Sequence, residues 1–176
     1  MNGQHVNINE YLKGGKSRLD NLFFRKAMGK FATGVTVVTT KTEEGIHGMT
    51  ANAFMSVSLE PKLVTISIDN KARMLDKIHK SKKFAISFLA EDQVHVSMHF
   101  AGQKKSDEEI EFEEIHNLPA IKGALATIAC EVTQSMVVGD HTLFVGKVLE
   151  IKVIDGQPLT FYGGKYGRYQ PLENAI

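Results

Sequence analysis

HTLFVGKVLEIKVID, at residues 141–155, is the stretch that decides the fold class of this chain. When it is read as a strand, apolar side chains fall on both faces, which is typical of a long strand between a core and a second packing surface. Residues 34–42, GVTVVTTKT, are dominated by β-branched residues, which fit a pleated sheet and crowd a helix. Both stretches therefore predict strands, with Val35, Val37 and Thr39 on one face of the second.

Other extended runs surround these two: IHGMTANAF, KLVTISID, KFAISFLA and LATIACEVTQSMVV. Between them, helical spacing of apolar residues predicts short helices at 19–32, 73–80 and 91–100. Six or more strands with only short helices favour an antiparallel barrel or sandwich over a doubly wound sheet.

The composition describes one ordered domain. The chain has 176 residues, 43% of them apolar, and a formal net charge of +1. That balance excludes general disorder and leaves no field that would attract nucleic acid or an anionic membrane. Residues 1–16 are polar and contain glycine, so we predict a flexible N-terminal arm followed by one domain at 17–176. The charged segment 104–114 is predicted to be a solvated loop or a short helix.

Targeting signals and cysteine usage point to one compartment. No apolar run approaches the length of a membrane helix, and the first residues lack the apolar core of a secretory signal. A single cysteine, Cys130, excludes a disulfide-stapled scaffold. We therefore predict a cytoplasmic protein. Cys130 lies in an apolar run, which favours burial over nucleophilic catalysis.

Several common site motifs are missing from the sequence. There is no G-x-G-x-x-G and no G-x-x-x-x-G-K-[ST], which excludes the Rossmann and P-loop fingerprints. His95 and His99 have i, i+4 spacing, but no third ligand or zincin glutamate accompanies them, so no metal site is predicted. No G-x-S-x-G elbow is present either.

Two segments remain unusual. Residues 48–62, GMTANAFMSVSLEPK, place Thr50 and Asn52 among small residues, where a ligand can approach the backbone and find donors and acceptors. The alternative is an edge strand followed by a serine-rich turn. In residues 139–146, GDHTLFVG, a turn delivers His141 to the start of a strand, although a histidine there more often has a structural role. The pattern alone supports a β-barrel that binds a small molecule.

The order and content of four motifs make the chain similar to a known family. FRKAMGKFATGVTVVTT, HGMTANAFMSVSLEPKLVTISI, Phe100-Ala101-Gly102 and GDHTLFVGKV follow one another along the chain. Together they resemble the short-chain flavin reductase family, the small components of two-component flavin-dependent monooxygenases. The likeness covers about residues 20–170 and is greatest to the reductase partners of phenol and 4-hydroxyphenylacetate hydroxylases.

The resemblance implies a fold and a reaction. The fold is an FMN-binding split barrel, a Greek-key antiparallel barrel, which forms an interleaved homodimer with a flavin near each subunit interface. The reaction is hydride transfer from NADH to FAD, or to FMN, after which the reduced flavin diffuses to a partner monooxygenase that hydroxylates a phenolic or aromatic substrate. A nicotinamide folded over the isoalloxazine needs no Rossmann domain, in agreement with the missing motif.

The resemblance also implies a set of site residues, with His141 expected near the nicotinamide. The residues expected around the flavin ring and its ribityl chain are Val35, Thr36, Thr50, Ala51, Asn52, Ser56, Val57 and Ser58. The residues expected near the phosphate or closing over the cofactors are Asp69, Asn70, Lys71, Phe100, Ala101 and Tyr166. Many relatives carry a serine in the phosphate segment, and this chain departs from that pattern.

Two rival functions fit the same kind of barrel. A flavin-binding electron carrier or sensor would keep its flavin and never oxidise NADH, and fold alone does not separate it from a reductase. An oligonucleotide-binding barrel would need basic residues interleaved with exposed aromatics. Four tyrosines, no tryptophan and a net charge near zero argue against that second alternative.

Overall fold

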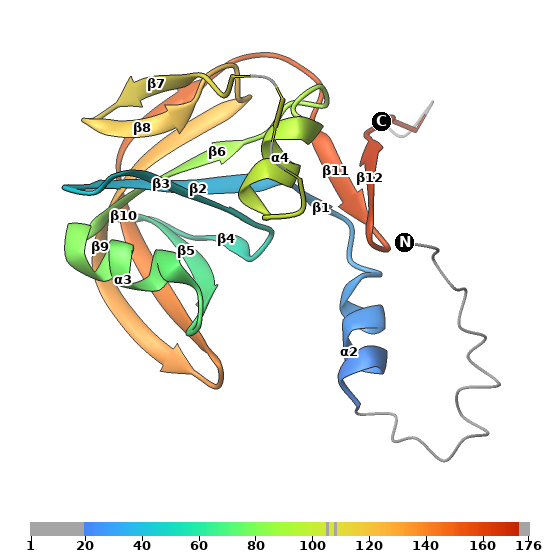
Figure 1. Cartoon of the computed structure of the whole chain (residues 1–176), viewed down its shortest axis with the longest axis horizontal. Helices are drawn as coiled ribbons and strands as arrows, with labels where there is room; N and C mark the ends of the chain where they lie inside the picture. Colours follow the sequence, from blue (N-terminus) through green and yellow to red (C-terminus); the bar gives the residue numbers. More distant parts are fainter. Residues whose placement is uncertain (1–19, 105, 108, 173–176) are drawn as a thin grey trace.

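Figure 1 shows the computed structural model of the chain, which describes residues 20–104, 106, 107 and 109–172. The predicted arm at 1–16 and the predicted domain start at Ser17 lie outside the described residues, so the domain boundary stays a prediction. Within the described ranges, no helix is long and apolar enough to cross a membrane.

The described residues are mainly antiparallel strands with three short helices, which confirms the predicted fold class. The helices are α2 (Asn21–Met28), α3 (Arg73–Ser81) and α4 (Val94–Phe100). The strands of the main sheet are β2 (Thr36–Thr42), β3 (Gly45–Ala51), β4 (Phe54–Leu59), β5 (Lys62–Asp69), β6 (Lys83–Phe88), β9 (Ala126–Val138) and β10 (His141–Val153). The accessory strands are β1 (Thr33–Gly34), β7 (Phe112–Ile115), β8 (Leu118–Ile121), β11 (Leu159–Tyr162) and β12 (Lys165–Arg168).

The main sheet closes on itself at one corner. Its strand order is β3-β2-β6-β9-β10-β5-β4, with all neighbours antiparallel. The two edge strands, β3 and β4, are joined by Asn52 and Ala53 alone. Because so short a link spans roughly 10 Å at most, the sheet must curl until its edges meet there. The Ser67 N–H donates to the Ala53 carbonyl at 3.1 Å and fixes this corner, which we call the seam.

Alternation along the strands decides what lies inside the barrel. Val38 of β2 points inward with the side chains that form the main core, while Val35 and Val37 point outward into a second core under α4. The predicted division of residues 34–42 between two faces is therefore confirmed. Helix α3 covers one side of the barrel and adds Met74 and Ile78 to the main core.

The outer face of the sheet has two unlike halves. Over β2, β6 and the first part of β9, the β7–β8 hairpin and α4 pack against the sheet, and we call this the covered half. Small residues at the contact, among them Ala85 and Ala129, allow the hairpin to approach closely. Over β4, β5, the start of β10 and the last part of β9 no described element packs, and we call this the uncovered half. Its exposed apolar side chains include Met55, Val57 and Met136.

The structure corrects two expectations about local structure. Segment 104–114 was expected to be a loop or short helix, but Phe112 to Glu114 begin β7, because they pair with β8 and cover the barrel. The first helix is shorter than the range 19–32. It begins after Asp20, whose carboxylate accepts the Phe23 N–H at 2.8 Å, and it ends at Met28 before Gly29.

Candidate functional site

A cavity of about 380 Å³ opens at the seam, within the size range of small-molecule sites. Its walls come from the segment before β2, the seam itself and the ends of β6 and β11. The lining residues are Phe31, Ala32, Thr33, Gly34, Val35, Thr36, Asn52, Phe54, Phe88, Leu89, Leu125, Pro158 and Leu159. Three of the predicted flavin residues, Val35, Thr36 and Asn52, therefore meet in one cavity although they are separated in sequence.

The chemistry of this cavity is that of an apolar slot with one polar edge. Phe54 and Phe88 form an edge-to-face pair with ring centroids 5.0 Å apart on one wall. The exposed Asn52 amide offers both a donor and an acceptor at the opening. The Thr36 hydroxyl donates to the Ala51 carbonyl, so this side chain holds β2 to β3. Such a slot suits a flat heteroaromatic ring with polar atoms along one side.

A second group of predicted residues meets where β5 ends beside β10. His141 lies opposite Asp69 in the ladder between the two strands. Ser67, bonded to the seam, lies two residues before Asp69, so the cavity and His141 occupy the same end of β5. The Lys71 N–H donates to the Asp69 carboxylate at 2.7 Å and closes the turn that follows the strand.

Electrostatics at this end centre on the neighbours Asp140 and His141. Nδ1 of His141 lies 2.8 Å from Oδ1 of Asp140. A hydrogen bond from the imidazole ring, helped by its charge when protonated, lowers the pKa of the Asp140 carboxyl. The carboxylate is fully at the surface and orients the ring from outside, which leaves the rest of the imidazole available to a ligand.

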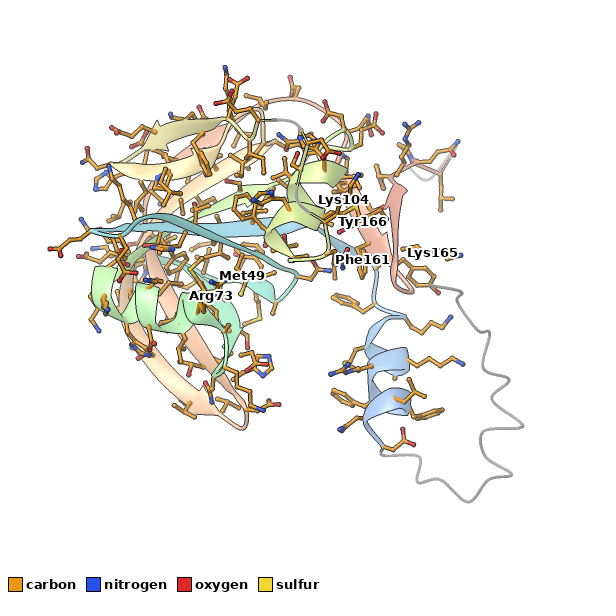
Figure 2. All side chains as sticks on the ribbon, viewed as in Figure 1. Met49, Arg73, Lys104, Phe161, Lys165 and Tyr166 are labelled. Carbon is orange, nitrogen blue, oxygen red and sulfur yellow. The ribbon has the colours of Figure 1, made fainter. Side chains whose placement is uncertain are left out.

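Four other predicted residues lie on the outer side of the barrel, around α4. The Thr50 hydroxyl donates to the Ser97 carbonyl at 2.7 Å, and the Ser97 hydroxyl lies 2.9 Å from the Tyr166 hydroxyl. In Figure 2, Tyr166 lies between α4 and the β11–β12 hairpin. The Phe100 ring lies directly over Gly48, where a Cβ would meet it at 2.4 Å. Ala101 follows as the exposed C-cap of α4. None of these four lines the cavity at the seam.

The remaining predicted residues, Ser56, Val57 and Ser58, lie on β4, the edge strand next to the seam. A register shift between Ser56 and Ser58 marks a bulge at Val57. Ser56 and Val57 are exposed and Ser58 is half-buried. The segment does contain an edge strand, as the alternative interpretation predicted, but both serines lie within that strand and not in a turn after it. A role in binding the ribityl chain stays a prediction.

Sequence analysis missed several members of the site. Phe54, Phe88, Leu125 and Pro158 line the cavity but read as ordinary apolar or loop residues. No local pattern marks them, because the closure of the barrel brings them together. Thr142 was also missed; its hydroxyl donates to the Asn70 side-chain carbonyl at 2.7 Å beside His141.

Other reactive groups lie away from the cavity. Burial raises the pKa of the Cys130 thiol to about 12, so it stays protonated in the core. His99 Nδ1 accepts the Ser106 N–H at 3.1 Å. Within the ranges that the structure describes, no cluster of three or more histidine, cysteine, aspartate or glutamate side chains is placed to hold a metal ion.

Comparison with known proteins identifies the class to which this barrel and cavity belong. The family description "Flavin reductase like domain" matches residues 28–170. An "NADH-dependent flavin reductase" of Rhodococcus sp is 48% identical over 82% of this chain and 84% of its own length. The "4-hydroxyphenylacetate 3-monooxygenase, reductase component" of Thermus thermophilus is 41% identical over 82% of this chain and 94% of its own length.

Solved structures agree with the sequence relatives. "Flavin reductase PheA2 in native state" is 54% identical, covers 87% of this chain and 100% of its own, and superposes with a TM-score of 0.84. The Streptomyces globisporus C-1027 NADH:FAD oxidoreductase SgcE6, solved in complex with NAD and FAD fragments, is 33% identical, covers 91% of this chain and 98% of its own, and gives a TM-score of 0.83. The chain belongs to the flavin reductase-like domain family, with the split-barrel fold that its resemblance implied.

Proposed function

We propose that this protein is an NADH-dependent flavin reductase that supplies reduced flavin to the oxygenase component of an aromatic monooxygenase. The observation that carries the proposal is the cavity at the seam, where Val35, Thr36 and Asn52 form an apolar slot with an amide at its edge. Relatives named as NADH-dependent flavin reductases and monooxygenase reductase components support the activity and the partner. A cytoplasmic location stays a prediction.

The residues present fit a flavin from ring to phosphate. The slot at the seam matches the isoalloxazine, and the Asn52 amide matches the polar edge of that ring. The N-terminus of α3 has Ala72 as its N-cap and no side-chain hydrogen bond there, which leaves backbone N–H groups for an anion. Lys71 directly precedes the N-cap, and Arg73 is the first residue of the helix (Figure 2), so both add positive charge at this helix start.

When bound, the flavin accepts the hydride of NADH and supplies the redox chemistry. The chain's own residues bind and orient the reactants. The apolar walls exclude water from the ring, Asn52 fixes its rotation, and His141 donates a hydrogen bond to the carboxamide or a phosphate of NADH. FAD and FMN both remain as substrates within this proposal, since the relatives' names include FAD and FMN reductases.

The proposal includes a homodimer. The uncovered half exposes Met55, Val57 and Met136, and α2 has no buried residue although Leu22 and Phe24 are apolar. Large apolar side chains exposed in this number are typical of interfaces. The uncovered half begins at the site, since β4 begins at the seam and β10 begins at His141, and α2 ends three residues before Phe31, which lines the cavity. We expect the second copy to cover them.

The direct test is a steady-state assay of NADH oxidation with FAD, FMN and riboflavin, each repeated with NADPH. A reductase oxidises NADH in proportion to added flavin. A carrier or sensor binds flavin but leaves NADH unchanged, which would contradict the proposal. His141→Ala should then lower turnover with NADH by about 5- to 150-fold and leave the affinity for oxidised flavin unchanged, because the lost contact is worth about 1–3 kcal/mol.

A further inference from the structure

One residue, Asn70, forms hydrogen bonds with both chain neighbours of His141. The Asn70 N–H donates to the Asp140 carbonyl at 2.9 Å, and the Asn70 side-chain carbonyl accepts the Thr142 hydroxyl at 2.7 Å. Asp140 and Thr142 are the chain neighbours of His141. Asn70, which directly follows β5, therefore holds His141 on both sides: through the carbonyl of the peptide bond before it and through the side chain of the residue after it.

The segment that carries Asn70 is itself rigid. The Asp69 carboxylate accepts the Lys71 N–H at 2.7 Å, and the Asp69 carbonyl accepts the Ala72 N–H at 2.9 Å. This Asx-type turn connects β5 directly to α3, whose side chains are part of the main core. Asn70 is thus anchored to the core and transfers that rigidity to the turn before β10.

Burial separates the roles of Thr142 and His141. Thr142 is 2% exposed, so water does not compete for its hydroxyl, whereas the His141 side chain is 42% exposed and faces the surface. Packing alone does not require a hydroxyl at a buried position, since valine fills the same volume without a polar atom to satisfy. The hydroxyl of Thr142 therefore serves its contact with Asn70.

We propose that Asn70 and Thr142 are positioning residues that hold the His141 ring where it can form its hydrogen bond to NADH. This inference rests on the proposed function, in which His141 contacts the dinucleotide. It differs from the phosphate role that the resemblance implies for Asn70. A phosphate needs the amide nitrogen of Asn70 as a donor, whereas the turn uses the carbonyl oxygen at the other side of the same amide. The two roles are separable by experiment.

Thr142→Val removes the hydroxyl at nearly constant volume. We expect kcat/KM for NADH to fall by about 3- to 10-fold, with the Kd for oxidised flavin within about twofold of the wild type. Thr142→Ser keeps the hydroxyl and should restore the kinetics. The chemical shifts of the His141 ring protons, measured by NMR at one pH, should change in the valine variant only, because the ring moves relative to its neighbours.

Thr65→Val is the matched control. The Thr65 hydroxyl donates to the Phe144 carbonyl at 3.0 Å between the same two strands, away from the turn. Its loss should leave both the NADH kinetics and the chemical shifts of the His141 ring protons at wild-type values. Asn70→Ala and the double variant Asn70→Ala with Thr142→Val complete a double-mutant cycle. The double variant should have the same kcat/KM for NADH as Asn70→Ala alone, because both substitutions remove the same contact.

The outcomes separate this inference from the proposed function. Wild-type protein that never oxidises NADH with any flavin contradicts the proposed function, while the chemical shifts of the His141 ring protons still test whether Thr142 positions the ring. If the wild-type protein is active and Thr142→Val changes neither the NADH kinetics nor the chemical shifts of the His141 ring protons, the inference is overturned. A weakened flavin Kd in Thr142→Val would also overturn it, because the residue would then act on the flavin site.

Discussion

The covered and uncovered halves of the main sheet have similar apolar patterns, but their outward-facing residues differ in burial. On the covered half, outward residues such as Ala85 and Ala129 are fully buried beneath the β7–β8 hairpin. On the uncovered half, outward residues such as Met55 and Met136 are 56% and 60% exposed. The alternation of side chains along a strand predicts that a face is apolar, but it does not predict which element covers that face. The first half stabilises the single chain, and the second is available for assembly.

The seam and its cavity lie where the two halves meet. The edge strand β3, where the Phe100 ring of α4 lies over Gly48, adjoins the covered half, while β4 belongs to the uncovered half, and only Asn52 and Ala53 join the two strands. A ligand at the seam therefore contacts residues beside the packed half on one side and the exposed strand β4 on the other. With the proposed second copy over β4, the binding of flavin would depend on assembly as well as on folding.

The largest expected effect is on the covered half. Ile115 of β7 is fully buried against the sheet, and Ile115→Ala should lower the free energy of unfolding by about 2–5 kcal/mol through lost burial and a cavity. Urea denaturation measures the change. Glu114→Ala, at an exposed position of the same strand, should stay within about 0.5 kcal/mol. Equal effects at the two positions would show that the hairpin adds no stability.

The next effect is on the uncovered half. Met136→Asp should weaken dimerisation by about 100-fold or more, because a carboxylate would be buried without a partner, while the monomer stays folded. Light scattering across protein concentration, with circular dichroism as the fold check, measures this. The control Ile46→Asp places the same charge at an exposed apolar position of the β2–β3 hairpin and should leave the dimer intact. A wild-type monomer at micromolar concentration would refute the assembly role.

A third prediction concerns the seam. Asn52→Leu should weaken the binding of oxidised flavin by about 5- to 150-fold, or about 1–3 kcal/mol, because the ring edge loses its amide partner. Fluorescence titration with FAD and FMN gives the dissociation constants. Gln103→Leu, an exposed amide after α4, is the control and should bind normally. An unchanged constant for Asn52→Leu would assign this residue to the strand link alone.

The smallest effect concerns the interior shared by both halves. Burial raises the pKa of Cys130 from 9.0 to about 12, so the unfolded chain releases this proton first as the pH rises. The contribution to stability is fully present below pH 9 and is lost as the pH approaches 12. At pH 10 the wild type should lose about 1 kcal/mol more than Cys130→Ala, relative to pH 8. If the free energy of unfolding changes equally with pH in the two proteins, the burial of this thiol is contradicted.

Much of the fold follows from local pattern. The β-branched run at 34–42 and the long run at 141–155 specify strands, because side chains alternate across a pleat whatever the strand contacts. The hairpin β11–β12 and the strand β7 escaped prediction, because each strand has only four residues and is stable only when it pairs with a neighbour.

The candidate site also has a part that local sequence predicts and a part that it does not. The segment with Asn52 and the turn with His141 stand out in the sequence through small residues, an amide and a turn before a strand. Their resemblance to a flavin reductase family is confirmed for the chain as a whole, while the role of each residue stays a prediction. Thr50 and Tyr166, expected at the cofactors, have hydroxyls bonded to α4 instead.

The sequence by itself determined the strands, the family and the two segments that carry its chemistry, since these depend on residue type and near neighbours. Only the tertiary structure decided that Phe54 and Phe88 pack edge to face in one wall of the cavity and that Asn70 bonds the residues on both sides of His141. It also decided which half of the sheet is covered. These features depend on closure of the barrel, which joins residues far apart in the chain through register and curvature that no local pattern contains.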